Sequence, residues 1–374
     1  MLNFKNGVNW VPALFLISYQ VVLLAALPFY FYFASTSISM GIITFILLYV
    51  TGLSITGGYH RFYAHRTFKT NRLMEWILLF FGSMAGQGSA LRWAFDHRLH
   101  HAYVDTDNDP YSIKKGFWYA HFLWILEKPR TIDSKVVPDL MKNNLVVFQD
   151  RFYGTLFFGS NILAFLVVGW FLNDYLGAFV LAVGLRLFLL HHFTWFINSL
   201  AHTWGEKPFS QEHSAVNNYV ISLLTFGEGY HNYHHTYAND YRNGVYWYQF
   251  DPTKWLLWGL SKLGLVQDLR KVDIYTIKKR MVIEHKNLLM ERLLKSWEDK
   301  RTEWEPTINE LSEKLVAKIS DFSRLKSRYL ELKAQCTETN ILRDLKKEMR
   351  DLKKSLRHDW KQWWQLSKTI MAQV

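Results

Sequence analysis

The chain has 374 residues, of which 49% are hydrophobic and 17% aromatic, and its formal net charge is +12. Its single cysteine, Cys336, excludes an intrachain disulfide framework and a cysteine-based metal site, so a metal would have to be bound by some of the 15 histidines. Residues 1–277 hold 38 charged residues with a net charge of +4, and residues 278–374 hold 38 with a net charge of +8. We therefore predict a membrane domain over 1–277 and a charged helical extension over 278–374.

Four apolar runs in the first region are long enough to cross a bilayer, which takes roughly 20 residues. The first pair covers 8–34 and 38–59, and the second pair covers 154–172 and 176–199. Each pair is joined by a short link without Lys or Arg. The first run is too long for the apolar part of a signal peptide. The pattern predicts an all-α membrane protein with four transmembrane helices in two hairpins.

Lys and Arg are concentrated in the loop 60–153 and after residue 202, which places both segments in the cytoplasm. We therefore expect an integral, multi-pass protein of a bacterial inner membrane with a helical cap facing the cytoplasm. The charges are explained by this topology, and no nucleic-acid partner is expected. The apolar run 73–91 could be a fifth span, but it would then put His60 and His97 on opposite sides of the membrane. We predict that it lies at the interface or against the protein.

The last 70 residues carry two apolar stripes at helical spacing, separated by residues 337–340. These stripes predict a helical hairpin or coiled coil that joins chains into a homo-oligomer or docks a partner. Their members are Leu311, Leu315, Ile319, Phe322, Leu325, Tyr329 and Leu332, and then Leu342, Leu345, Met349, Leu352, Leu356, Trp360 and Trp363.

Nine histidines fall at the ends of the predicted spans, in three clusters and one single position. Residues i, i+3 and i+4 of a helix share a face, so each H-x-x-H-H cluster directs three imidazoles towards one volume. Residues i and i+5 lie about 140° apart on a straight α-helix, so the H-x4-H pair needs a helix end or a bend to converge. The nine are His60 and His65; His97, His100 and His101; His202; and His231, His234 and His235.

Nine neutral imidazoles exceed what one ion binds, so two metal ions are expected, and imidazole suits Zn, Cu, Fe and Ni alike. A metal transporter or an inactive membrane scaffold are alternatives, but ligands on a transport path should lie in mid-membrane rather than at span ends. The remaining histidines are interpreted as hydrogen-bonded core residues: His121, His191, His192, His213, His285 and His358.

The order H-x4-H, H-x2-H-H, H-x2-H-H between paired spans resembles the membrane fatty acyl desaturases, and most closely their stearoyl-CoA (Δ9) type. The similar segments are T-G-G-Y-H-R-F-Y-A-H-R-T-F-K at 56–69, D-H-R-L-H-H at 96–101, D-P at 109–110, N-S-L-A-H at 198–202 and G-E-G-Y-H-N-Y-H-H at 227–235. The resemblance covers about residues 8–275 and leaves the tail outside. It implies an O2-dependent enzyme that introduces a cis double bond into a saturated acyl chain at two iron ions, which Zn can replace in recombinant protein.

The resemblance also implies how the ligands are divided. One iron would take His60, His65, His97, His101 and His234. The other would take His100, His202, His231 and His235, with Asn198 holding a water.

For the substrate, the resemblance implies an acyl tunnel with a kink lined by Gln87, Trp93, Thr194 and Trp195, and a closed end at Thr44 and Leu48. The Asn and Arg that contact CoA in the family are Gly88 and Phe95 here, and Arg92, one helical turn from Phe95, replaces an acid. Acyl-CoA is the expected carrier, and an acyl lipid or acyl carrier protein is the alternative.

A di-iron membrane hydroxylase would share the histidine boxes, although not the G-E-G-x-H-N-Y-H-H segment. Either enzyme would work beside membrane lipid and would need an electron carrier of the ferredoxin, rubredoxin or cytochrome b5 type with its reductase. The basic cytoplasmic face suits an acidic carrier.

Overall fold

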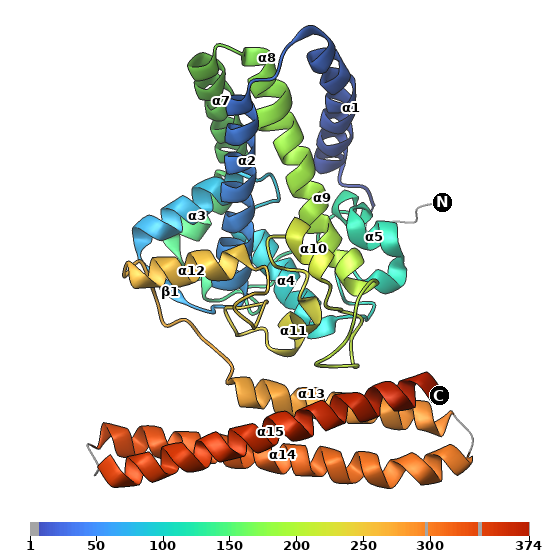
Figure 1. Ribbon diagram of the computed structural model, residues 1–374. Coiled ribbons are helices and arrows are strands. Elements are labelled where there is room, and N and C mark those ends of the chain that lie inside the picture. Colours follow the sequence, from blue (N-terminus) through green and yellow to red (C-terminus); the bar gives the residue numbers. More distant parts are fainter. Residues whose placement is uncertain (1–6, 296–297, 336–338, 374) are drawn as a thin grey trace. The chain divides into compact units, whose positions relative to one another are not determined.

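The computed structural model describes residues 7–295, 298–335 and 339–373 (Figure 1). Cys336 and residues 337–338 of the expected tail linker lie outside the described residues. The chain divides into two compact units, Met1–Lys207 with Glu212–Lys271, and Pro208–Gln211 with Val272–Val374. The predicted boundary at 277/278 falls within a helix of the second unit, and we propose Lys271 as the end of the membrane domain.

Four long helical segments of the first unit are apolar enough to cross a membrane: Trp10–Phe33, Ile38–Ala64, Tyr153–Leu172 and Tyr175–His202. They include helices α1 (Trp10–Phe33), α2 (Ile38–Leu53) with the π-helix η1 (Ser54–Ala64), α7 (Tyr153–Leu172), and α8 (Tyr175–Gly177) with the π-helix η5 (Ala178–Leu185), α9 (Arg186–Asn198) and η6 (Leu200–His202). The predicted all-α fold with four membrane-spanning helices is confirmed.

The tips of the two hairpins are closed by local capping. The Ser37 side chain accepts a hydrogen bond from the Met40 N–H at 3.1 Å, which begins α2. Asn173 adopts a left-handed conformation at the end of α7, and Asp174 caps the next helix through the Gly177 N–H at 2.7 Å. Tyr30 of α1 donates to Asp174 at 2.8 Å, so the two hairpins are also joined at this end.

The ambiguous run forms α3 (Arg72–Met84), whose 13 residues extend about 20 Å and cannot cross a bilayer core of about 30 Å. A Cβ at Gly82 would lie 2.4 Å from the ring of Tyr59, so glycine lets α3 pack against η1. Positive φ angles at Gly86 and Gly88 then turn the chain sharply into α4 (Ala90–Tyr103).

Shorter elements gather around α4 at the end of the spans opposite the hairpin tips (Figure 1). Strands β1 and β2 pair antiparallel, with Thr70 opposite Val266. The bounds are β1 (Lys69–Thr70), η2 (Ile113–Lys115), α5 (Phe117–His121), η3 (Leu123–Leu126), η4 (Leu140–Lys142), α6 (Asn144–Arg151), α10 (Tyr219–Leu224), α11 (His231–Thr236), α12 (Pro252–Lys262) and β2 (Val266–Gln267).

The second unit consists mainly of α13 (Ile274–Leu294), α14 (Glu298–Ala334) and α15 (Thr339–Gln373). The predicted helical extension is confirmed; the predicted apolar stripes begin only at Leu311, whereas the structure adds α13 to the same helical unit. One apolar core joins all three helices through residues such as Leu289, Leu315 and Trp363.

Candidate metal centre

The nine predicted histidines lie on η1 and the residue after it, α4, η6 and α11, and the structure brings them together in two groups. Within each group, one ring nitrogen per residue lies within 4.8 Å of all the others. The groups are His60, His65, His97, His101 and His234, and then His100, His202, His231 and His235. This division is the one that the resemblance implies, and it cuts across both H-x-x-H-H clusters.

A π-helix brings His60 and His65 onto one face. Its hydrogen bonds run from i to i+5, and the His65 N–H donates to the His60 carbonyl at 3.1 Å. One π turn therefore separates the two residues, and their ring centroids lie 4.9 Å apart. The π-helix at the end of the second span therefore brings the His60 and His65 rings together, which a straight α-helix would not do.

The ring nitrogens within the groups are spaced as ligands of a common ion would be. The Nε2–Nε2 distances are 2.9 Å for His60–His234, 2.8 Å for His65–His97 and 3.2 Å for His100–His235. Two nitrogens that are each about 2.1 Å from one ion, and at right angles, lie about 3 Å apart.

Carboxylates fix the opposite side of two of these rings. Nδ1 of His60 lies 3.0 Å from Glu228, and Nδ1 of His100 lies 2.9 Å from Asp109. A neutral imidazole has one N–H, and when His100 donates it from Nδ1 to Asp109, Nε2 offers only a lone pair to the neighbouring nitrogens. Among the described residues, the buried Nε2 of His202 also has no hydrogen-bond partner. Lone pairs facing one another repel unless a cation lies between them, so the residues fit a pair of metal ions.

Burial keeps most of these imidazoles in the neutral form that binds metal. Removal from water lowers the pKa because it penalises the charged ring, and the neighbouring imidazoles lower it further. This holds for His65, His97, His101, His231, His234 and His235.

The sequence analysis did not identify the residues that orient the ligands. Besides Glu228 and Asp109, Tyr111 Oη lies 3.1 Å from His97 Nδ1, and Ser214 Oγ lies 2.7 Å from His202 Nδ1. Asp105 accepts hydrogen bonds from both the N–H and the hydroxyl of Ser214. Such partners set the tautomer and basicity of a ligand. Glu228 is part of the G-E-G segment and Asp109 is part of the D-P segment, but the spacing along the sequence does not show which histidine each of them contacts.

Glu228 is also part of a buried ionic network behind the first group. Arg61 donates to Glu228 at 3.0 Å and to Asp251 at 3.0 Å, and the three side chains are at most 1% exposed. Burial alone would raise the pKa of Glu228, but His60 and Arg61 outweigh it and hold this pKa below its usual value. Asp251 in turn caps α12 through the Lys254 N–H at 2.9 Å. The network connects η1, the loop before α11 and the start of α12.

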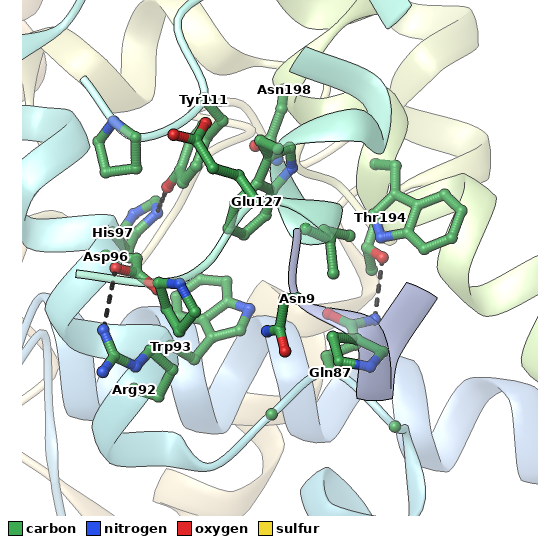
Figure 2. A pocket seen from close by; sticks show the side chains of 18 of the residues that line it. Asn9, Gln87, Arg92, Trp93, Asp96, His97, Tyr111, Glu127, Thr194 and Asn198 are labelled. Atoms are coloured by element: carbon green, nitrogen blue, oxygen red, sulfur yellow. Dashed lines mark hydrogen bonds and ion pairs between the residues drawn. The ribbon is translucent and has the colours of Figure 1, made fainter. Parts of the chain in front are cut away.

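A cavity of about 520 Å³ reaches the first histidine group (Figure 2). His60 and His97 line it, and Gln87 donates to Thr194 at 2.9 Å in its wall. Its other predicted lining residues are Arg92, Trp93, Trp195 and Asn198. Arg92 lies 3.6 Å from Asp96 and donates to the Arg130 carbonyl at 2.7 Å. Thr44 and Leu48 are buried in α2 but are not among the residues that line this cavity, so their role stays a prediction.

The other histidines only partly match their interpretation as hydrogen-bonded core residues. His191 contacts Tyr19 at 2.8 Å and the Ala85 carbonyl at 3.0 Å, His121 pairs with His192, and His285 pairs with Ser367. The interpretation is wrong for His358, which is exposed. It is also wrong for His213, because its two ring nitrogens are buried without a hydrogen-bond partner among the described residues.

Comparison with known proteins agrees with this geometry. The family model described as "Fatty acid desaturase" matches residues 36–267. The chain belongs to the fatty acid desaturase family. This desaturase-family protein is 38% identical to "Probable acyl-CoA desaturase" of Schizosaccharomyces pombe over 77% of its own length, and 33% identical to "Acyl-CoA desaturase 1" of Saccharomyces cerevisiae over 83%. It spans 60% of the length of each of these two yeast proteins.

A third relative is the "sn-2 palmitoyl-lipid 9-desaturase" of Nostoc, which is 34% identical over 69% of this desaturase-family chain and 89% of the relative. The relatives thus carry both acyl-CoA and acyl-lipid names. Because the first of them are from yeasts, the expectation of a bacterial inner membrane has no support, and only the membrane-protein part of it stands.

Proposed function

We propose that the protein is an O2-dependent fatty acyl desaturase that introduces a cis double bond of the Δ9 type into a saturated, carrier-bound acyl chain. The observation that carries this proposal is the pair of histidine groups, the first of which opens through His60 and His97 into a cavity beside the membrane-spanning helices. The ligands would be divided as the two groups are, with Asn198 holding a water. Two iron ions and O2 would supply the oxidising power to break two unactivated C–H bonds, which side-chain acids and bases cannot do.

The chain's own residues would position the acyl chain and keep water out. Trp93 stacks on His97 with ring centroids 4.7 Å apart, so the cavity wall next to the ligands is an aromatic face. On another side, buried Trp195 and the Gln87–Thr194 hydrogen bond form a rigid wall from α9 and the turn before α4. A saturated chain held between these walls would present a fixed pair of adjacent carbons to the ligands.

Electron balance calls for a partner. Removing two hydrogen atoms from the chain and reducing O2 to two waters consumes two further electrons and two protons. A carrier of the ferredoxin, rubredoxin or cytochrome b5 type with its reductase would supply the electrons, on the cytoplasmic side that the Lys and Arg distribution indicates.

One face of α15 supports the docking of an acidic carrier. At 100° per residue, all Lys and Arg of this helix fall within an arc of about 120°, and its four acidic residues fall outside. Every member of the arc is exposed, and we call these residues the basic face: Arg343, Lys346, Lys347, Arg350, Lys353, Lys354, Arg357, Lys361 and Lys368. Such a surface raises the association rate of an acidic protein. If copies of the chain assembled through the C-terminal helices, that assembly would compete with the carrier for the second compact unit.

The proposal is tested by profiling the fatty acids of a host that expresses the protein or its His100→Ala variant. We expect new monounsaturated chains with wild type and none with the variant, at equal amounts of membrane-inserted protein. Hydroxylated chains would assign the protein to a hydroxylase, and equal profiles would refute both activities.

A further inference from the structure

The cavity that reaches the histidines also reaches the apolar outer surface of the spans. Val11 of α1 and Phe158 of α7 both line the cavity, yet 81% and 56% of their surfaces are exposed. Residues that face a cavity and the outside at once mark an opening. This opening lies between the first turns of α1 and α7.

Little of the described chain closes the opening. The helix α1 packs mainly against η5 and η3. Across the gap towards α7, the Phe15 ring meets Phe157 and Phe158, with centroids 5.3 and 6.4 Å away. Gly154 lines the cavity next to these rings, and a Cβ built there would meet nothing within 4 Å. Among residues 7–295, aromatic rings that rotate about two side-chain bonds are thus the main barrier at this opening.

The depth of the opening matches the interfacial region of a bilayer. Val11 and Phe15 lie in the first two turns of α1, and Gly154 and Phe158 lie in the first two turns of α7. Both helices begin at the end of the spans where the histidine groups lie, which is the level of lipid glycerol and ester groups. An acyl chain passing here would move from the bilayer core into the cavity while its headgroup stayed at the interface.

Cationic side chains line the polar part of the same cavity. Lys115, Lys128 and Arg130 are exposed there. Two of the neighbouring carboxylates already have partners, since Glu127 accepts from Tyr119 at 2.9 Å and Asp96 lies 3.6 Å from Arg92, while the exposed Asp107 also lines the cavity. A phosphate at the end of a bound lipid would therefore meet ammonium and guanidinium groups.

We infer that the gap between α1 and α7 is a lateral portal, formed by Val11, Phe15, Gly154, Phe157 and Phe158, through which an acyl chain of a bilayer phospholipid reaches the metal ligands. The substrate class is then an acyl lipid rather than the acyl-CoA expected from the sequence. This inference rests on the proposed function for the reaction, but the portal itself rests only on the cavity and its exposed lining.

The test uses iron-loaded protein in nanodiscs of distearoyl phosphatidylcholine, with ferredoxin and its reductase as the electron source. Gly154→Trp would fill the portal, and Gly159→Trp is its matched control, because Gly159 is on the same helix, has nothing within 4 Å of a Cβ and does not line the cavity. Wild type and the control should desaturate the phospholipid at equal rates, and the portal variant at least ten-fold more slowly with unchanged iron content.

A phosphatidylcholine carrying a diazirine on its acyl chain gives a readout that is independent of activity. After irradiation, mass spectrometry should place the label at residues 11–15 and 154–158 in wild type and the control, and several-fold less of it there in Gly154→Trp. Full phospholipid turnover by the portal variant, or label confined to other surfaces, would overturn the portal. If iron-loaded wild type converts neither phospholipid nor added stearoyl-CoA, the proposed function fails, while the labelling pattern still decides the portal.

Discussion

Glu228→Gln should loosen one metal ion of the two. The Glu228 carboxylate has three nitrogen neighbours: Oε2 lies 3.0 Å from His60 Nδ1 and accepts a hydrogen bond from Asn243, and Oε1 accepts from the Arg61 guanidinium at 3.0 Å. Glutamine keeps the shape but has one acceptor oxygen, so its NH2 group must face one of these donors. Either His60 and Asn243 lose the oxygen that they face, or Arg61 retains only Asp251 and the Tyr241 carbonyl.

The expected effect is large enough to measure and small enough to leave the protein folded. Loss of an orienting partner typically costs 10–100-fold in metal affinity, which corresponds to about 1.4–2.7 kcal/mol. A lost hydrogen bond to the charged Arg61 would lower the free energy of unfolding by about 1.5–3 kcal/mol. Only the group that contains His60 should be affected, because Asp109 orients His100 in the other group.

The assay is a chelator titration with iron counted by mass spectrometry. Wild type should release both ions together at high chelator, whereas Glu228→Gln should release one ion at 10–100-fold less chelator. Asp109→Asn should weaken the other ion by a similar factor. Asp240→Asn is the matched control, since this buried carboxylate holds Tyr233 at 2.8 Å and Arg242 at 2.7 Å. Wild-type retention of both ions by Glu228→Gln, or equal loss of both, would refute the reasoning.

Three further predictions concern the tail, the partner and the chain length. Deletion from Val272, where the second compact unit begins, should leave the iron content of the membrane domain unchanged in mass spectrometry, and loss of iron would make the tail part of the catalytic fold. Arg350→Glu with Arg357→Glu on the basic face should raise the KM for an acidic electron carrier several-fold at low salt, and the difference should vanish at high salt. If Thr44 and Leu48 close the acyl tunnel, Leu48→Ala should favour longer chains and Thr44→Trp shorter ones in gas chromatography of the products. Each CH2 is worth about 1 kcal/mol, so the product ratios should change roughly ten-fold, and unchanged ratios in both variants would place the tunnel end elsewhere.

The membrane architecture could be predicted because it depends on local composition. Runs of about 20 apolar residues and the charge of the links between them decide where helices cross a bilayer. Most of α13 falls inside the predicted extension, but its part in the apolar core was missed because residues such as Val282 and Leu289 become a core only when α14 and α15 pack against them. That packing is a tertiary effect and leaves little trace in the helix's own pattern.

The histidine groups show both the strength and the limit of helix periodicity. Spacing correctly indicated that the H-x-x-H-H clusters face one region, but it could not divide them between two groups, since that depends on how α4 and α11 cross. The convergence of His60 and His65 depends on a π-helix, whereas the sequence analysis predicted a helix end or a bend at this place. Orienting partners such as Glu228 and Asp109 were likewise beyond spacing arguments, because they are set by side-chain contacts between distant segments.

The central claim is that O2 is used to remove two hydrogens from a saturated chain without adding oxygen to it. The most direct measurement supplies iron-loaded protein with perdeuterated stearoyl substrate and ¹⁸O2, and examines the product by mass spectrometry. We predict a cis monoene that has lost two deuterium atoms and contains no ¹⁸O, with the label recovered in water. A product that has lost one deuterium and gained ¹⁸O as an alcohol would contradict the account.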